Sequence, residues 1–468
     1  MDSIIISLTG SKPLYMQIYE HIRNSIIKGE YAKNEPLPSI RGLAKALSVS
    51  KITVEKAYDQ LCSEGYIEGR ERSRFYVAEL SEPAWISPEI QIKHKKAAES
   101  GDDRTEYLYD FSSGEMDLEG FDFALWKKYM SRALSSTERL MKYGETRGEK
   151  ELRAEIAKYL NRSRGVSVEP SQIIVGANTQ VLIGQLCTLL DAEKDTIAFE
   201  NPGFSNGRRV FTDHGFTVLP ISTQDGGVNV EELKKSGAKA VYVSPSHQFP
   251  TGQIMPAPKR LSLLKWAAEN GSYIIEDDYD SEFRYYGNPI PAMKGMDRQD
   301  YVIYVGSFSK IIPPSIRISY MILPEKLLKV YKSREAYYSQ TASATEQLTL
   351  ALFLADGQLD RQIRRLRNIY SEKRRQFNKT LGTVFGDKGE IYDTGSGLFV
   401  IFDARTDKTR LEIKEAAAER HIRVRFVGDY YMEKDRREND KRLLLYFSSI
   451  KTADMHKALT LLKEAIES

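Results

Sequence analysis

The segment from Gly176 to Gln180, Gly-Ala-Asn-Thr-Gln, has the residue types of a phosphate-binding turn. It follows the apolar run QIIVGA and opens the helical stretch VLIGQLCTLL. Backbone N–H groups and the dipole at a helix start attract phosphate. Any turn from a strand to a helix favours small polar residues, so this segment alone is a weak signal.

Three further groups of chemically useful residues follow apolar runs. The acidic cluster Glu276–Asp280 comes after one run, and Asn201–Phe204 places an aromatic ring after another. Gly306–Lys310 ends a third run with a lysine, and Arg317 follows seven residues later. Taken singly, these groups have ordinary explanations: a solvated turn, a core aromatic ring and a surface lysine.

The region 107–468 alternates apolar runs with helical segments, and examples of the runs are QIIVGA, DTIAFE, AVYVSP, YIIEDD and VIYVGS. Such alternation predicts an α/β fold with a mainly parallel sheet. In sheets of this kind, ligands gather at the carboxyl ends of the strands. The four groups fall at those ends, so we expect them to meet in one site.

The start of the chain has a different pattern. Apolar residues at helical spacing predict a helix over 14–28, a second helix from Ser39 and a third helix with Ser50 as its N-cap. Two short strands, 66–68 and 75–77, follow with a polar stretch between them. This order of helix, helix-turn-helix and two-stranded wing predicts a winged helix-turn-helix.

Basic and polar side chains of this region fall where DNA would select them. Arg41 opens the second helix, Lys51 and Thr53 open the third, and the wing stretch 69–74 carries three arginines. Phosphates select helix N-termini and cationic side chains, and polar residues at the start of a third helix suit the major groove. On charge placement alone, a small helical domain with a solvated charged face is an equally good interpretation.

Length and composition limit the classes of protein. A chain of 468 residues should hold two or three domains, and we expect a head over 1–80, a linker over 81–106 and a body over 107–468. We expect neither a signal peptide nor a membrane span. The two cysteines, Cys62 and Cys187, are far apart, which argues against a disulfide framework or a metal site and favours the cytoplasm.

The stretch PLPSIRGLAKALSVSKITVEKAYDQLCSEGYI (36–67) resembles the winged-helix domain of the GntR family. The shared patterns are Pro-Ser-x-Arg, Leu-Ala, Val-Ser and Thr-Val-x-x-Ala-Tyr-x-x-Leu-x-x-x-Gly. The resemblance implies binding to double-stranded operator DNA through Ser39, Arg41, Ser50, Lys51, Thr53 and Arg70. The wing GRERSRFYV is bulkier and more basic than the glycine-rich wing tips usual in the family, which leaves its groove contacts open.

The body resembles the fold type I aminotransferases over almost its whole length, so the whole chain is similar to the MocR/GabR family of chimeric regulators. The resemblance implies pyridoxal 5'-phosphate as cofactor, bound covalently by Lys310. A lysine suits this role because desolvation and nearby positive charge lower its pKa. Asp277 would pair with the pyridine nitrogen, Tyr279 would donate to the phenolic oxygen of the ring, and Phe204 would stack on its face.

The same resemblance implies a cup for the cofactor phosphate and a homodimer. Arg317 would form charge-assisted bonds to the phosphate, and the other cup residues are Asn178, Thr179, Ser307 and Ser309. Tyr143, in YGETRG, matches the position from which these folds reach the phosphate of the neighbouring subunit. This match implies a homodimer in which residues of both subunits form each active site.

Two departures from the aminotransferase pattern concern the ligand. Where aminotransferases commonly have Asn-Pro-Thr-Gly, this chain has HQFPTG, and either His247 or Gln248 could replace the asparagine. The arginine that would bind a ligand carboxylate is not evident. The candidates are Arg208, Arg209, Arg423 and Arg425, and strand alternation predicts that the last two point the same way.

Three functions remain open from the sequence. The leading hypothesis is a transcription regulator whose aminotransferase-like domain senses an amino acid, an amine or pyridoxal phosphate itself. The second is a working aminotransferase that carries a DNA-binding head. The third is an architectural DNA-binding dimer with an inactive body.

Overall fold

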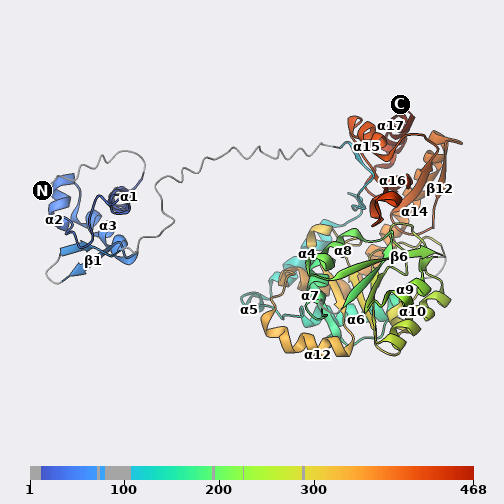
Figure 1. Ribbon diagram of the computed structural model, residues 1–468, viewed down its shortest axis with the longest axis horizontal. Helices are drawn as coiled ribbons and strands as arrows, with labels where there is room; N and C mark the ends of the chain where they lie inside the picture. Colours follow the sequence, from blue (N-terminus) through green and yellow to red (C-terminus); the bar gives the residue numbers. More distant parts are fainter. Residues whose placement is uncertain are drawn as a thin grey trace. The chain divides into compact units, whose positions relative to one another are not determined.

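The computed structural model describes residues 12–70, 74–79, 107–191, 195–224, 226–286 and 290–467. The chain divides into two compact units, Met1–Asp103 and Arg104–Ser468, which we call the head and the body (Figure 1). The predicted linker 81–106 and Arg72 of the wing lie outside the described residues. Within the described ranges, no helix is long and apolar enough to cross a membrane.

The head is a three-helix unit with a short hairpin, as predicted. Its elements are α1 (Leu14–Ile27), α2 (Ile40–Leu47), α3 (Lys51–Ser63), β1 (Ile67–Arg70) and β2 (Arg74–Val77). Ser39 and Ser50 cap α2 and α3, because each hydroxyl accepts a backbone N–H from the first turn of its helix. Between the two helices, Ser48 adopts a left-handed conformation with a φ of 53° and turns the chain sharply.

The body is built on an eight-stranded sheet with the order β4-β11-β10-β9-β8-β5-β6-β7. Five neighbouring strands, β10, β9, β8, β5 and β6, are parallel, whereas β11 is antiparallel to β10 and β4. The predicted α/β fold with a mainly parallel sheet is therefore confirmed. The strands are β4 (Ile173–Gly176), β5 (Thr196–Asn201), β6 (Thr217–Gln224), β7 (Gly227–Val228), β8 (Ala240–Val243), β9 (Tyr273–Asp278), β10 (Val302–Ser307) and β11 (Ser319–Ile322).

Helices cover both faces of this sheet, which is why its central strands are continuous apolar runs. Successive residues of β9 show the two layers: Ile275 packs in one hydrophobic cluster with α7, α8 and α12, and Ile274 packs in another with α9 and α10. These helices are α7 (Thr179–Cys187), α8 (Ser205–Asp213), α9 (Val230–Ser236), α10 (Ala257–Asn270) and α12 (Glu325–Arg334). Further helices of the body are α4 (Phe123–Leu134), α5 (Thr137–Leu140), α6 (Lys150–Arg164), α11 (Met293–Met296) and α13 (Ala344–Ala355).

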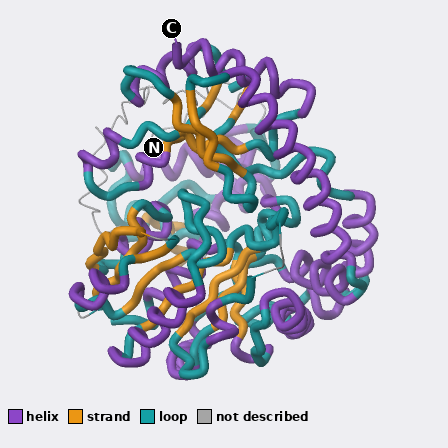
Figure 2. Tube along the Cα trace, turned by 90° about the vertical axis from the view of Figure 1, so that its right-hand side faces the viewer, coloured by secondary structure: helices purple, strands orange, loops and turns teal. Residues whose placement is uncertain are grey.

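A smaller lobe is formed by the end of the chain around a four-stranded sheet with the order β12-β13-β16-β15. Figure 2 shows its strands as a group apart from the large sheet, with helices along the outside. A separate parallel pair, β3 with β14, ties the first residues of the body to this lobe. The elements are β3 (Tyr109–Asp110), α14 (Gln358–Phe385), β12 (Gly389–Tyr392), β13 (Phe399–Ala404), α15 (Arg410–Glu419), β14 (Ile422–Arg423), β15 (Arg425–Phe426), α16 (Lys434–Asn439), β16 (Leu443–Tyr446) and α17 (Met455–Glu467).

Candidate cofactor site and DNA-binding surface

Three strand ends are in register at one edge of the large sheet. Ser319, the first residue of β11, is paired with Ser307 at the end of β10 and with Gly176 at the end of β4. Because β11 is antiparallel to both neighbours, its start lies beside their carboxyl ends. The segments that follow Gly176 and Ser307 therefore meet the segment that precedes Ser319.

A cavity of about 170 Å³ lies at this point. All five predicted cup residues line it, and so does Phe204, the predicted stacking ring. The lining residues are Ala177, Asn178, Thr179, Gln180, Phe204, Asn206, Ser307, Ser309, Arg317, Ile318 and Ser319. Three of the four groups singled out in the sequence are thus brought together in one cavity.

The cavity wall combines hydrogen-bond donors with a cation. The N–H groups of Thr179 and Gln180 open α7 and have no partner within the helix, whereas that of Val181 donates to the side chain of Asn178. The hydroxyl of Ser319 donates to Ser307, which donates to Ser309, both at 3.0 Å. Arg317 adds the positive charge from a left-handed backbone with a φ of 59°. This combination suits an anion that carries several acceptor oxygens, such as a phosphate ester.

Lys310 follows this edge of the sheet, and its surroundings favour the neutral amine. Its Nζ donates to the carbonyl oxygen of Gly114 at 2.7 Å. Burial lowers the pKa of the Lys310 amine, although the carboxylates of Asp280 and Glu115 act in the opposite direction. A lysine with a lowered pKa is more often unprotonated and therefore a better nucleophile.

Three of the four acids in the cluster at the end of β9 have strong partners. Asp278 is ion-paired with Arg164 at 2.7 Å. Asp280 lies 2.9 Å from Nδ1 of His247. Glu276 accepts two backbone N–H groups at the start of α11, at 2.7 and 2.8 Å. These contacts explain why the three acids can be buried, and they leave the fourth acid for another role.

Among the described residues, Asp277 is the acid of this cluster that has neither a cationic partner nor a backbone N–H donor. It is buried, and the hydroxyl of Tyr242 donates to its Oδ2 at 2.7 Å. Burial raises the pKa of Asp277 to about 7, although the bond from Tyr242 acts against this change. The ring of Phe204 stacks near that of Tyr242, with 6.1 Å between centroids. A cationic ring nitrogen placed beside Asp277 would restore the charge of this carboxylate.

Tyr279 contacts a buried histidine. Its hydroxyl lies 3.0 Å from Nδ1 of His247, the atom that also contacts Asp280. Nε2 of His247 is buried without a hydrogen-bond partner. The side chain of Gln248, in contrast, donates to two backbone carbonyls and holds its own turn. Of the two residues that could replace the missing asparagine, His247 is the one that contacts a predicted ring-binding residue.

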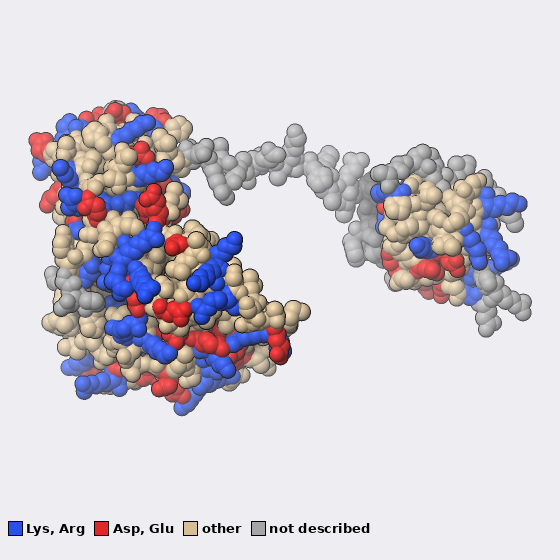
Figure 3. Space-filling view, turned by 180° about the vertical axis from the view of Figure 1, so that it is seen from behind, with Lys and Arg blue, Asp and Glu red and all other residues tan. Residues whose placement is uncertain are grey.

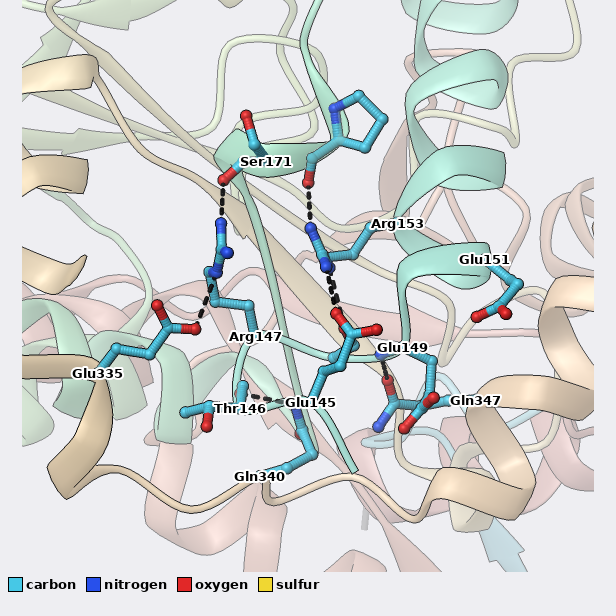
Figure 4. A network of polar contacts seen from close by, with 12 residues as sticks. Glu145, Thr146, Arg147, Glu149, Glu151, Arg153, Ser171, Glu335, Gln340 and Gln347 are labelled. Atoms are coloured by element: carbon cyan, nitrogen blue, oxygen red, sulfur yellow. Dashed lines mark hydrogen bonds and ion pairs between the residues drawn. The ribbon is translucent and has the colours of Figure 1, made fainter. Parts of the chain in front are cut away.

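Tyr143 is fully exposed and lies outside the lining of the cavity. The loop that follows it is anchored by a polar network (Figure 4). Arg147 donates to Glu335 at 2.9 Å, and Arg153 donates to Glu145 at 2.7 Å. The backbone N–H of Glu149 also donates to the side chain of Gln347. The Tyr143 ring is therefore presented to solvent from an anchored loop.

The four candidate arginines occupy different environments. Arg209 is exposed and pairs with Asp213 at 2.8 Å, whereas Arg208 is buried in α8. Arg423 and Arg425 are both exposed on either side of a buried residue and line the same recess of the small lobe, as alternation predicts. None of the four lines the phosphate cavity.

Gly114 and Tyr446 belong to the surroundings of Lys310 and escape prediction from the sequence. A Cβ atom on Gly114 would lie 2.7 Å from Nζ of Lys310 and 2.7 Å from Cε1 of Tyr446, so this approach requires glycine. Gly114 stands in FSSGEMD and Tyr446 in RLLLYFSS. Neither segment carries a chemical signal, and only the isolated glycine hints at a close contact.

The predicted DNA-binding residues of the head gather at the starts of α2 and α3. Arg41 and Lys51 are exposed there, next to the capping residues Ser39 and Ser50. The hydroxyls of Ser50 and Thr53 lie 2.7 Å apart. Figure 3 shows basic side chains of the head concentrated along one edge and acidic ones on another part of the same view.

Arg70 differs from these residues because its guanidinium already has partners within the head. It forms an ion pair with Glu68 and donates to the side chain of Asn34 at 2.5 Å. It also lies over the ring of Tyr76, 5.0 Å from the centroid. Contact with a phosphate would compete with these interactions.

Comparison with known proteins identifies both parts. The profile of bacterial regulatory proteins of the gntR family matches residues 14–77, and that of aminotransferase class I and II matches residues 107–442. The uncharacterized HTH-type transcriptional regulator YdeL of Bacillus subtilis is 37% identical over 97% of this chain and 96% of its own. The probable rhizopine catabolism regulatory protein MocR of Rhizobium meliloti is 33% identical over 80% of this chain and 78% of its own length. The chain belongs to the MocR-type family of transcription regulators.

Relatives of this MocR-type chain also include the pyridoxine biosynthesis transcriptional regulator PdxR of Corynebacterium glutamicum, which is 31% identical over 89% of this chain and 88% of its own. Among solved structures, an archaeal alanine:glyoxylate aminotransferase matches with a TM-score of 0.70 and 23% identity, over 77% of this chain and 91% of that chain. That likeness shows the shared fold. The predicted resemblance is confirmed: the head implies DNA binding, and the aminotransferase fold implies dependence on pyridoxal phosphate.

Proposed function

We propose that this MocR-type regulator binds pyridoxal phosphate at the edge of the large sheet and uses the loaded body to sense an amino acid, an amine or the cofactor itself. The observation that carries the proposal is the cavity of about 170 Å³ at that edge. It is lined by all the predicted cup residues and by Phe204. The nearby amine of Lys310 has a lowered pKa, and Asp277 is buried without a cation.

The donor set fits the cofactor group by group. Arg317, the serine hydroxyls and the start of α7 would bind the phosphate, and Phe204 would cover the ring. Asp277 would keep a proton on the pyridine nitrogen, and Lys310 would hold the cofactor covalently. Tyr279, positioned by His247, would donate to the phenolic oxygen. When bound, the cofactor supplies an electron-accepting ring whose carbonyl carbon reacts with amines.

The head would bind operator DNA through the residues at the starts of α2 and α3, with Arg41 and Lys51 as the exposed cations. A homodimer would use the exposed Tyr143 to complete the phosphate site of its partner. An effector regulates such a dimer only by binding two arrangements of it with different affinities. We place this regulation in the cytoplasm, where Cys62 and Cys187 remain free thiols.

Two measurements on the full chain test the proposal. The visible absorbance spectrum should show a band after pyridoxal phosphate is added, and amino acids or amines should shift that band. The same compounds should change the affinity for promoter DNA. Absence of a band would contradict the cofactor assignment. Sustained transfer of amino groups to a keto acid, without an effect on DNA binding, would favour an aminotransferase.

A further inference from the structure

The outer face of α3 consists of side chains that the hydrophobic core of the head does not use. The residues of α3 that pack into that core, together with α1, are Val54, Ala57, Tyr58 and Leu61. The exposed residues of the helix are Lys51, Ile52, Glu55, Lys56, Asp59 and Ser63. Because side chains three or four positions apart are neighbours on a helix, Ile52, Glu55, Lys56 and Asp59 form one continuous outer face.

Ile52 is the apolar member of this face. It is 64% exposed, more than any other large apolar residue in the described part of the head, and it takes no part in the core. Single exposed apolar residues are common on protein surfaces, so exposure alone says little. The position of Ile52 says more, because it lies in the first turn of α3 beside the exposed cation Lys51, within the proposed DNA-binding surface.

The hydroxyl groups next to Ile52 are already engaged within the head. Ser50 accepts the backbone N–H of Thr53 at 3.1 Å, and the hydroxyls of the two residues lie 2.7 Å apart. Thr53 is also half-buried, and Val54 is buried. In the first turn of α3, Lys51 and Ile52 are therefore the two side chains that remain available to a ligand.

Glu55 places a negative charge beside Ile52 on the same face. Within the described head, its exposed carboxylate forms no ion pair with Lys51 or Lys56. A carboxylate on a DNA-binding face is repelled by the phosphates, and this loss is offset only where a base offers a hydrogen-bond donor. In the major groove, the amino group of cytosine is a donor of this kind.

The geometry of the helix-turn-helix brings both residues to base edges. The N-terminal residues of its second helix, here α3, reach the bases in the major groove. The apolar group that bases present there is the C5-methyl of thymine, and covering it removes apolar surface of Ile52 from water. The axial rise from Ile52 to Glu55 is about 4.5 Å, close to the spacing of about 3.4 Å between base pairs. The two side chains therefore meet neighbouring base pairs.

We propose that α3 selects the operator by placing Ile52 against the methyl group of a thymine and Glu55 against the amino group of a neighbouring cytosine. This inference rests on the proposed binding of operator DNA and adds the bases that the head recognises. Arg41 and Lys51 hold the phosphates and fix the position of α3, whereas Ile52 and Glu55 determine the specificity.

Replacing thymine by uracil, which removes only the C5-methyl, tests the role of Ile52. Selection from random double-stranded DNA with the full chain supplies tightly bound duplexes, and each thymine is then replaced in turn. At one or more thymines, replacement should weaken binding to wild type about 3- to 10-fold. The same replacement should change binding to Ile52→Ala less than about 1.5-fold. Absence of a sensitive thymine, or equal sensitivity in both proteins, overturns the proposal.

Ile27→Ala is the matched control. Ile27 is an exposed isoleucine at the end of α1, outside the core, and its replacement should leave the sensitivity to uracil as in wild type. Thermal unfolding should be the same for Ile52→Ala and wild type, because Ile52 packs against no core residue. If Ile52→Ala binds the thymine duplexes as tightly as wild type but the protein changes its oligomeric state, Ile52 contacts protein and the proposal is overturned.

Glu55→Gln tests the second contact by a change of preference. A glutamine side chain can bond to both N6 and N7 of adenine, so selection with this variant should favour adenine where wild type favours cytosine, by about 10-fold. The preferred position should be the neighbour of the thymine that is sensitive to uracil. An unchanged preference for cytosine, or no preference by wild type at that position, overturns the role of Glu55.

The selection also separates this inference from the proposed function. If wild type enriches no duplex over random DNA, the proposed binding of operator DNA fails and the inference falls with it. If wild type enriches duplexes in which the thymine methyl groups have no effect, binding of operator DNA stands and only the reading by Ile52 fails.

Discussion

The head and the body present their ligand-binding side chains in opposite ways. In the head, Arg41 and Lys51 are exposed at the starts of two helices, and their positions are set by serine caps one or two residues away. In the body, the cup is assembled from the ends of β4 and β10 and the start of β11, far apart in the chain. The first arrangement suits a long, hydrated polyanion, and the second suits a small ligand that is largely enclosed.

This difference has a consequence for mutation. A head residue acts mainly through its own charge, so its effect should be moderate and dependent on salt. A body residue acts within a set of fixed partners, so its removal should have a larger effect on one ligand and little effect on the other unit. The four predictions below test this contrast, from the largest expected effect to the smallest.

Lys310→Ala should abolish the visible band of the bound cofactor, because Lys310 is the proposed point of covalent attachment. The affinity for DNA without effector should change less than about threefold, since no residue of the head is altered. Absorbance spectra and DNA titrations measure the two effects. Lys326→Ala, on the exposed side of α12, is the control and should leave both unchanged. A band that persists in Lys310→Ala would contradict the lysine assignment.

Arg317→Gln should weaken binding of pyridoxal phosphate by about 10-fold or more, because a charge-assisted contact to the phosphate is lost. Arg298→Gln, an exposed arginine outside the cavity lining, should leave the affinity unchanged. Equilibrium dialysis of the cofactor-free protein against pyridoxal phosphate measures the affinity. Similar affinities for the two variants would remove Arg317 from the phosphate site.

Arg41→Ala should weaken DNA binding by ~1–3 kcal/mol if Arg41 contacts a base, or lower the salt dependence by about one charge if it contacts a phosphate. Arg70→Ala should have the smaller effect, because Arg70 is already paired with Glu68 and bonded to Asn34. DNA titrations at several salt concentrations compare the two variants. An effect of Arg70→Ala as large as that of Arg41→Ala would mean that DNA displaces Glu68.

The body without cofactor should become less stable as pH rises from about 5 to 8. Burial raises the pKa of Asp277 to about 7 and that of Glu200 to about 8. The folded state therefore binds more protons than the unfolded state in this range, and its stability is lost as pH rises through the folded pKa values. Thermal unfolding at several pH values measures the trend. Asp277→Asn should flatten it, and an unchanged slope would contradict the raised pKa of Asp277.

Prediction from the sequence succeeds where the signal is local. Ser39 and Ser50 are followed by apolar residues at helical spacing, and they cap the helices as expected. Asn178, Ser307 and Ser309 lie at the carboxyl ends of apolar strands, as the sequence indicates, whereas their role in the cup is what the family resemblance implies. The hydrogen bond from Arg70 to Asn34 does not follow from the sequence, because Asn34 is distant in the chain.

Within the acidic cluster, the sequence cannot show which acid lacks both a cation and a backbone N–H donor. Asp278 is neutralised by Arg164 and Asp280 contacts His247, and both partners come from distant segments. The assignment of Asp277 from family resemblance agrees with this pairing. His247 and Gln248 are adjacent in the sequence and equivalent as polar residues, yet only the folded turn directs His247 to Tyr279.

The sequence by itself determined the two-part organisation, the winged head, the α/β body and the polar groups that follow its strands, whereas the roles of the cup residues rest on the family resemblance. These features depend on periodicity, caps and strand ends, which are properties of neighbouring residues. Among the described residues, the tertiary structure decided that Asp277 has only the hydroxyl of Tyr242 as a partner and that Arg425 contacts the hydroxyl of Tyr430 without an ion pair to a carboxylate. The reason is that pairing depends on distances between side chains from separate strands and helices, and those distances exist only in the folded chain.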